Sequence, residues 1–136
     1  MTSQIGVAPG RAERPDAVTL DRRVIAEFGR GADGSVPEFV VGLISQFIEE
    51  ASAQVEQMRD AGQRADAPAL KAIAHSLRGS SNMLGAKRLA ILCEQIERGA
   101  GQPSFSTAEA LLSDVDQEFV NVRYALKAEL QGAGDR

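Results

Sequence analysis

Apolar residues recur at alternating spacings of three and four along four segments of the chain, and this period constrains the fold more than any other feature of the sequence. Charged residues fall on the opposite faces, and the low aromatic content of 4% also favours helices over sheets. The four apolar stripes are Val40, Ile44, Phe47, Ala51, Val55 and Met58; Leu70, Ile73, Leu77, Ser81 and Leu84; Leu89, Leu92, Cys93 and Ile96; and Leu112, Val115, Phe119, Val122, Leu126 and Leu130. The chain is therefore predicted to be all-α.

Short connections between the stripes set the order in which these helices pack. Asp66 is a suitable N-cap with Pro68 in the first turn after it, and Gly85 suits the left-handed residue that commonly ends a helix. Such connections join antiparallel neighbours, so we expect an up-down-up-down antiparallel four-helix bundle. A short additional N-terminal helix, from Thr19 as N-cap to Phe28, is expected to pack on one end of it.

Domain boundaries follow from where the periodic pattern begins and ends. The bundle domain is predicted to span residues 19–131, between a flexible N-terminal tail of residues 1–18 and a flexible C-terminal tail of residues 132–136. Ser35 and Glu38 have the spacing of a capping box and predict the start of the first long helix. Ser106 and Glu109 have the same spacing and predict the start of one last helix, which carries the fourth stripe.

Charge and composition exclude several classes of function. The formal net charge of −4 gives no support to a nucleic-acid or anionic-membrane partner. No apolar run is long enough to cross a bilayer and the N-terminus lacks a signal pattern, so a cytoplasmic, monomeric protein is expected. The single cysteine, Cys93, excludes an internal disulfide, and the single histidine, His75, leaves no ligand cluster for a metal.

The candidate site lies on the polar face of the second predicted helix, the one that contains His75. Lys71, His75, Arg78, Gly79 and Asn82 fall together on its solvent side at spacings of three and four. A glycine inside a helix costs about 1 kcal/mol relative to alanine, and Gly79 would leave open space one turn from the imidazole. With two cations beside it, the ring is interpreted as a nucleophile with room for an anionic group such as phosphate.

Simpler interpretations of the same residues exist. A lone histidine on a polar helix face is most often an ordinary surface residue. The absence of acidic residues between Ala67 and Cys93, where Lys71, Arg78, Lys87 and Arg88 occur, is also typical of a solvated basic face. Placed around the histidine, these cations would instead complement an acidic partner surface.

The run His75-Ser-Leu-Arg-Gly-Ser-Ser-Asn-Met-Leu-Gly-Ala, followed by Leu89 and by Cys93-Glu-Gln-Ile-Glu97, resembles the histidine-containing phosphotransfer (HPt) domain. The resemblance covers roughly residues 66–98, and Arg78 stands where that family commonly has lysine. It implies that His75 accepts a phosphoryl group from the aspartate of one response-regulator receiver domain and passes it to another in a multistep phosphorelay that starts at a hybrid sensor kinase. The reacting atom would be the ring nitrogen remote from the backbone.

The same resemblance assigns roles to the neighbouring residues. Lys71 and Arg78 would stabilise the phosphate, Gly79 would give clearance, and Asn82 would hydrogen-bond near the ring. A partner-binding role is expected for Met83, Lys87 and Arg88. No cofactor is expected on this chain, since the Mg²⁺ of the reaction would belong to the receiver domain.

Two other classes of function stay open at this point. The bundle could be the phosphoacceptor part of a sensor histidine kinase, although Ser76 follows His75 where those kinases typically have an acidic residue, and no nucleotide-binding motif is present. It could also be a helical adaptor that only binds a partner. We therefore expect a phosphotransfer intermediate rather than an enzyme that uses ATP.

Overall fold

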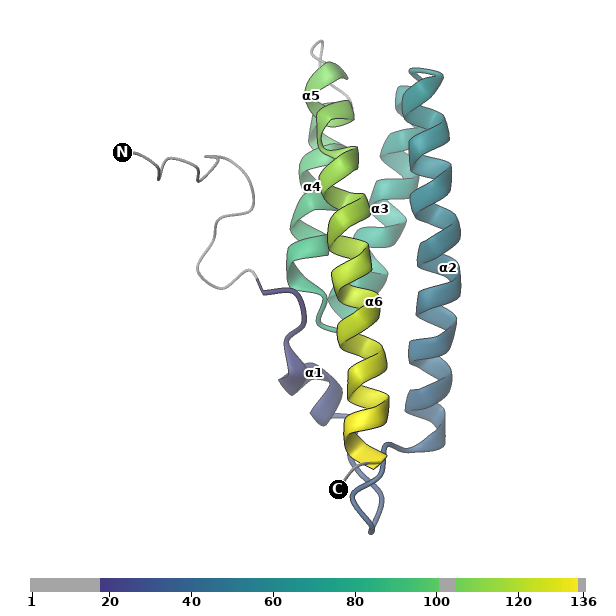
Figure 1. The fold of residues 1–136 in the computed structure, drawn as a ribbon. Helices are drawn as coiled ribbons and strands as arrows, with labels where there is room; N and C mark the ends of the chain where they lie inside the picture. The colour runs from purple at the N-terminus through teal and green to yellow at the C-terminus, as the bar shows by residue number, and fades with distance from the viewer. Residues whose placement is uncertain (1–17, 101–104, 135–136) are drawn as a thin grey trace, which may run out of the picture.

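The computed structural model describes residues 18–100 and 105–134, and within these ranges all regular structure is helical (Figure 1). The helices are α1 (Arg22–Ala26), α2 (Glu38–Gln63), α3 (Ala67–Met83), α4 (Lys87–Ala100), α5 (Phe105–Ala110) and α6 (Leu112–Gly134). Four of them, α2, α3, α4 and α6, lie side by side and alternate in direction. The predicted all-α, up-down-up-down antiparallel four-helix bundle is confirmed.

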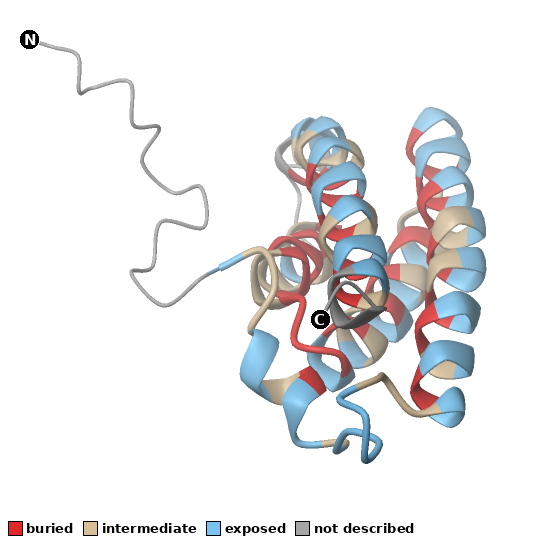
Figure 2. Cartoon of the chain, turned by 60° about the horizontal axis from the view of Figure 1, so that its bottom comes forward, coloured by how far each residue is buried: buried red, intermediate tan, exposed pale blue. Residues whose placement is uncertain are grey.

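The core lies along the axis of the bundle, where each long helix turns one face inward (Figure 2). Most residues of these faces belong to the stripes predicted from the sequence, because a period near 3.6 puts them on one side of a helix. Ile73, Leu112 and Leu130 of those stripes are only partly buried, and Ala74 is fully buried. The largest fully buried apolar side chains are Ile44, Met58, Leu70, Leu77, Leu89, Ile96, Leu126, Val40, Val115 and Val122. Burial of about 1.5–3 kcal/mol per such side chain holds the four helices together.

The two ends of α3 are fixed as predicted, and these ends position His75. The Asp66 carboxylate caps the helix by accepting a hydrogen bond of 3.2 Å from the Ala69 amide. After Met83 the chain turns through Gly85, whose φ of +85° lies in the left-handed region. The α3–α4 connection is consequently tight, and the two helices return alongside each other over most of their length.

The short helix α1 packs on one end of the bundle, as expected (Figure 1). Ile25 is buried, the Asp21 amide donates to the Gly85 carbonyl at 2.7 Å, and Arg22 pairs with the buried Glu129 of α6. Its start was predicted wrongly, because the N-cap is Asp21, whose carboxylate accepts from the Arg23 amide. The side-chain hydrogen bond from Arg23 and, to a smaller extent, this bond from the Arg23 amide hold the pKa of the Asp21 carboxyl below its usual range.

Two further details of the helices differ from the expectation. The predicted capping box before α2 does not form, since Pro37 is the N-cap and the Ser35 amide instead bonds the Asp33 carboxylate at 3.0 Å. The last segment is two helices rather than one, with a break at Leu111.

Glycines lie where α5 and the start of α6 pack on their neighbours. A Cβ atom added to Gly99 of α4 would lie 3.2 Å from the Cβ of Ala108, and one added to Gly62 of α2 would lie 2.5 Å from a terminal carbon of Leu112. The chain therefore packs α5 closely on α4 and the start of α6 closely on α2.

The predicted tails lie mainly outside the described residues. Of the N-terminal tail only Val18 is described, and α6 continues to Gly134, past the predicted end of the domain at residue 131. Within residues 18–100 and 105–134, none of the helices combines the length and the apolar character needed to cross a membrane.

Candidate functional site

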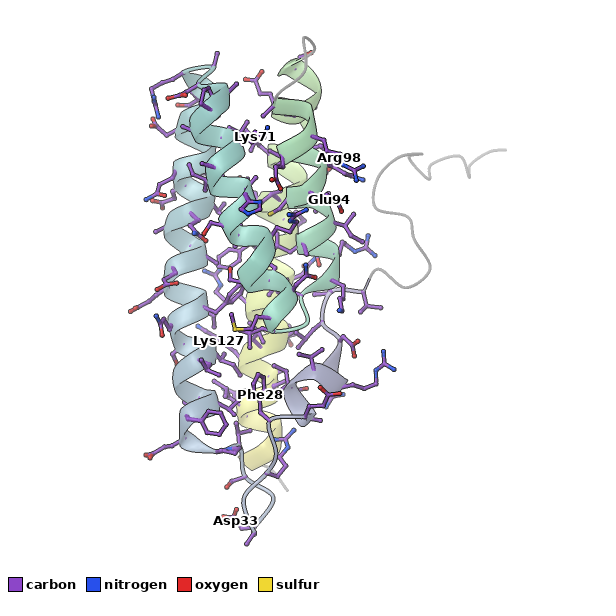
Figure 3. All side chains as sticks on the ribbon, turned by 180° about the vertical axis from the view of Figure 1, so that it is seen from behind. Phe28, Asp33, Lys71, Glu94, Arg98 and Lys127 are labelled. Carbon is purple, nitrogen blue, oxygen red and sulfur yellow. The ribbon has the colours of Figure 1, made fainter. Side chains whose placement is uncertain are left out.

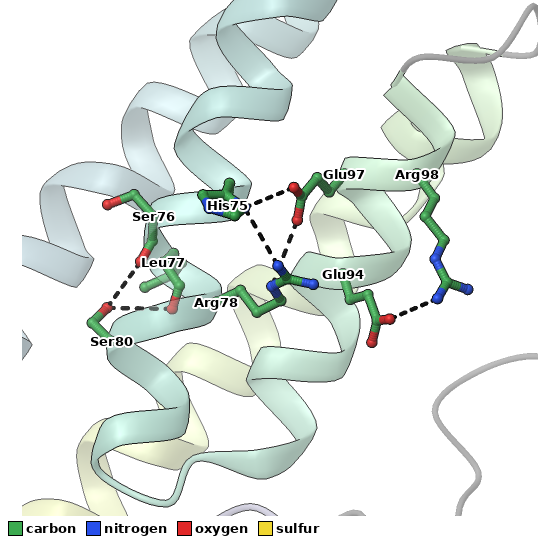
Figure 4. A network of polar contacts seen from close by, with 8 residues as sticks. All are labelled: His75, Ser76, Leu77, Arg78, Ser80, Glu94, Glu97 and Arg98. Carbon is green, nitrogen blue, oxygen red and sulfur yellow. Dashed lines mark hydrogen bonds and ion pairs between the residues drawn. The ribbon is translucent and has the colours of Figure 1, made fainter.

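His75 lies near the middle of α3 with its side chain in solvent (Figure 4). Leu70, Ala74 and Leu77 of the same helix are fully buried, so the histidine, on the opposite side, is turned away from the core. Its side chain is 63% exposed. The site is therefore open to another macromolecule, as the sequence predicted.

Glu97 of α4 holds one nitrogen of the imidazole. The Nδ1 atom of His75 lies 2.8 Å from Oε2 of Glu97, whose side chain is only 17% exposed. A carboxylate can only accept, so the proton of the neutral ring belongs on Nδ1 and the lone pair on Nε2. Both contacts of the ring with described residues are made at Nδ1, and none is made at Nε2. The nitrogen remote from the backbone is thus the free nucleophilic atom.

Arg78, one turn after His75, completes a cluster of three polar side chains. Its Nε lies 3.6 Å from Oε1 of Glu97, and its Nη2 lies 3.4 Å from Nδ1 of His75. Because Nδ1 donates its single proton to Glu97, Arg78 does not donate to the ring and instead balances the charge of the carboxylate. Arg78 and His75 also line the same hollow between α3 and α4.

A hollow of about 420 Å³ opens beside the imidazole between α3 and α4. His75, Arg78, Gly79 and Asn82 line it from α3, and Ala90, Ile91 and Glu94 line it from α4. A Cβ atom added to Gly79 would meet no other atom within 4 Å, so the absent side chain serves no packing contact and leaves the space open. The open space predicted at Gly79, one turn from the imidazole, is therefore present.

Acidic side chains from α4 lie within this site, which the sequence reasoning did not anticipate. Besides Glu97, the carboxylate of Glu94 borders the hollow and pairs with Arg98 at 2.7 Å. Figure 3 shows Glu94 and Arg98 on the same face of the molecule as Lys71. The surroundings of His75 are therefore a mixed set of charges rather than the uniformly basic face expected from the interval between Ala67 and Cys93.

The other predicted residues are distributed over the surface around the site. Lys71 is exposed one turn before His75 but does not line the hollow. Met83 is 58% exposed and borders a different depression, between α2 and α3. Lys87 is half-buried at the start of α4, and Arg88 points toward α6, where its Nε lies 3.9 Å from the buried Glu118. The site thus unites four of the eight residues that the sequence singled out.

Cys93 lies one turn before Glu97 on the buried side of α4. Burial, and to a smaller extent the nearby charge of Glu97, raises the pKa of its thiol to about 12. A thiol that stays protonated is a poor nucleophile and a poor metal ligand. In the described part of the chain, no group of three or more His, Cys, Asp or Glu residues is placed to hold a metal ion.

The fold and the site together define a class of protein: a helical bundle that presents one exposed histidine, with Nδ1 bonded to a carboxylate and a hollow beside the ring. Residues 42–133 match the model of the Hpt domain family, and the chain belongs to that family. The resemblance noted in the sequence is confirmed.

Two known proteins show the extent of the similarity. The chain is 32% identical over 102 residues to histidine-containing phosphotransfer protein 2 of Arabidopsis thaliana; the match covers 73% of this chain and 62% of that protein's length. The crystal structure of histidine-containing phosphotransfer protein B from Pseudomonas aeruginosa has a TM-score of 0.75 and 31% identity, over 85% of this chain and 96% of the other.

Proposed function

We propose that His75 carries a phosphoryl group between receiver domains in a multistep phosphorelay, accepting it from one aspartate and passing it to another. The observation that carries this proposal is the imidazole itself, exposed in solvent with Nδ1 bonded to Glu97 and Nε2 open beside a hollow. The names of both similar proteins, which call them histidine-containing phosphotransfer proteins, support it. The partners would be receiver domains and a hybrid sensor kinase, and the protein would act as a monomer.

The chemistry needs no base from this chain. The lone pair on Nε2 attacks the phosphorus of the aspartyl phosphate, the N–P bond forms as the P–O bond to aspartate breaks, and the aspartate leaves as a carboxylate. The ring keeps its proton on Nδ1 and becomes positively charged, and the carboxylate of Glu97 stabilises that charge at 2.8 Å. The return step reverses these movements of electrons.

The neighbouring residues support the same transfer. Arg78 is placed to pair with the phosphoryl oxygens, and Gly79 admits the partner's aspartate. Asn82 borders the hollow and can donate a hydrogen bond to an oxygen there. The Mg²⁺ that the reaction needs would be bound by the receiver domain, so no residue of this chain is assigned to it.

The test is to incubate the purified protein with a receiver domain that has been phosphorylated with ³²P-labelled acetyl phosphate. We expect acid-labile, alkali-stable label on the wild-type chain and none on His75→Gln, because the chain contains one histidine. Ser76→Ala is the matched control, since it changes the exposed neighbour of His75 and should be labelled like the wild type.

Other outcomes would identify the alternative functions. Label that appears with ATP alone would show a kinase activity and contradict the relay. Stable binding of the phosphorylated receiver without any label on the chain would show an adaptor. Label that persists in His75→Gln would place the acceptor on another residue.

A further inference from the structure

A second depression lies on the other side of α3 from the hollow, between α2 and α3. We name it the α2–α3 notch; its residues are Leu43, Gln46, Phe47, Glu50, Ser80, Met83 and Leu84. Its volume is about 200 Å³, which is below the range of about 300–1,000 Å³ for small-molecule pockets. The notch therefore fits a side chain of another protein better than a free ligand.

The inner surface of the notch is apolar and adaptable. Phe47 and Leu84 form buried walls, and Met83 is 58% exposed at the edge. A methionine has three rotatable bonds and adjusts its shape to an incoming side chain. The hydroxyl of Ser80 donates its proton to the backbone carbonyls of Leu77 and Ser76, at 3.3 and 3.4 Å, so it is not a free donor for a partner.

One side of the notch carries a negative charge without a cation. The Gln46 amide donates to Oε2 of Glu50 at 2.9 Å and holds this carboxylate at the rim. Among the residues that the structure describes, no lysine or arginine pairs with Glu50. An apolar depression beside an unpaired carboxylate is complementary to an apolar side chain flanked by a lysine or arginine.

The notch and the site of His75 belong to one continuous surface. Ser80 lines the notch while its neighbour Gly79 lines the hollow, and Met83 lies eight residues after His75, about 12 Å along the helix. A partner that docks along α3 can contact both. A second copy of the chain seated there would cover the approach to His75, which the proposed transfer requires to be open.

We propose that the α2–α3 notch selects the receiver domain, by accepting one apolar side chain of the receiver with a lysine or arginine that pairs with Glu50. This inference rests on the proposed function, since it names the feature by which the partner of His75 is recognised. Glu50 and Met83 are specificity residues in it and take no part in the chemistry.

The experiment measures binding and leaves the transfer of phosphate out. A panel of purified, unphosphorylated receiver domains is titrated into His75→Gln by calorimetry, and the tightest binder is the probe for variants made in that background. We expect Glu50→Lys to weaken binding about tenfold at low salt, with a smaller effect at 0.5 M salt. Met83→Ala should weaken it about tenfold at both salt concentrations.

Glu56→Lys is the matched control, because it makes the same change of charge at an exposed position of α2 that does not line the notch. We expect this variant to bind within twofold of its parent. Restored binding of Glu50→Lys by a receiver whose lysine or arginine is changed to glutamate would identify the pair directly.

Three results would overturn the inference: binding unchanged in Glu50→Lys and Met83→Ala, no binding by any receiver, or a dimer in sedimentation that Met83→Ala abolishes. The last would make a second copy the occupant of the notch. Labelling of His75 in the separate transfer assay, with binding unaffected by the notch variants, would contradict this inference alone and leave the proposed function intact.

Discussion

Replacing Gly79 with alanine should make the protein more stable and should also slow the phosphoryl transfer proposed for His75. Gly79 is inside α3, its φ is not in the left-handed region, and an added Cβ would meet no atom within 4 Å. Alanine has the higher helix propensity, and no steric clash offsets this gain, so the free energy of unfolding should rise by about 1 kcal/mol. For a chain of this size the melting temperature should rise by roughly 3–5 °C.

The rate of phosphoryl transfer should fall, because the added carbon enters the hollow beside His75. Gly79→Leu, which fills more of that space, should slow transfer about a hundredfold by displacing the incoming phosphate, with Gly79→Ala in between. Circular dichroism gives the melting temperatures, and rapid-quench transfer from a labelled receiver domain gives the rates.

Gly42 offers a matched control for both measurements. It lies in α2, is exposed, and likewise has no atom within 4 Å of an added Cβ. Gly42→Ala should raise the melting temperature by a similar amount and leave the rate unchanged. If Gly79→Leu transferred the phosphoryl group at the wild-type rate, the clearance argument would be refuted. If Gly79→Ala melted at a lower temperature than the wild type, the position would not be sterically free.

Three other predictions concern the environment of the site and its supports. Glu97→Gln should slow phosphoryl transfer roughly five- to tenfold, because one charge-assisted hydrogen bond to a largely exposed ring is lost. ¹⁵N NMR should show more of the tautomer with its proton on Nε2. An unchanged tautomer ratio would contradict the assignment of the proton to Nδ1. Because burial raises the pKa of Cys93 to about 12, iodoacetamide at pH 8 should alkylate the native protein at least about a hundredfold more slowly than the urea-unfolded chain. The folded state holds this proton more tightly than the unfolded chain does, so its contribution to stability is full below about pH 8.5 and is lost as the pH rises toward 12; equal alkylation rates would disprove the burial. Gly85→Ala should lower the free energy of unfolding by at least about 2 kcal/mol, because φ is +85° and an added Cβ would lie 2.7 Å from the Asp21 carbonyl oxygen. Urea unfolding measures this change. A decrease of less than about 1 kcal/mol would show that α1 shifts to accommodate the extra carbon.

The helices and the exposed face of α3 could be predicted because they depend on local information. The stripe from Val40 to Met58 and the cap at Asp66 each follow from residues within one or two turns. His75 and Gly79 could be placed in the same way, since both lie on one helix and one turn apart. The break at Leu111 could not, because no glycine or proline lies beside it to mark the end of a helix.

Glu97 was missed for a similar reason. It is 22 residues from His75, and which residue of α4 meets the imidazole depends on how α4 is rotated against α3, a property of the packed core rather than of spacing. One signal was available: Glu97 follows Cys93 by one turn, at the margin of the apolar stripe, where a carboxylate is held close to the neighbouring helix. The contact of Arg88 with Glu118 of α6 was missed in the same way, since the two residues lie far apart in the sequence; the Arg88 side chain remains 40% exposed.

The bond between Glu97 and Nδ1 leaves the imidazole with one available nitrogen on one side of α3. On the proposed function, donor and acceptor would use that nitrogen in succession rather than together. Each partner would then compete with the other, and transfer would follow ping-pong kinetics. Dissociation of the first partner would have to precede binding of the second, and an excess of either partner would slow the transfer of phosphoryl groups.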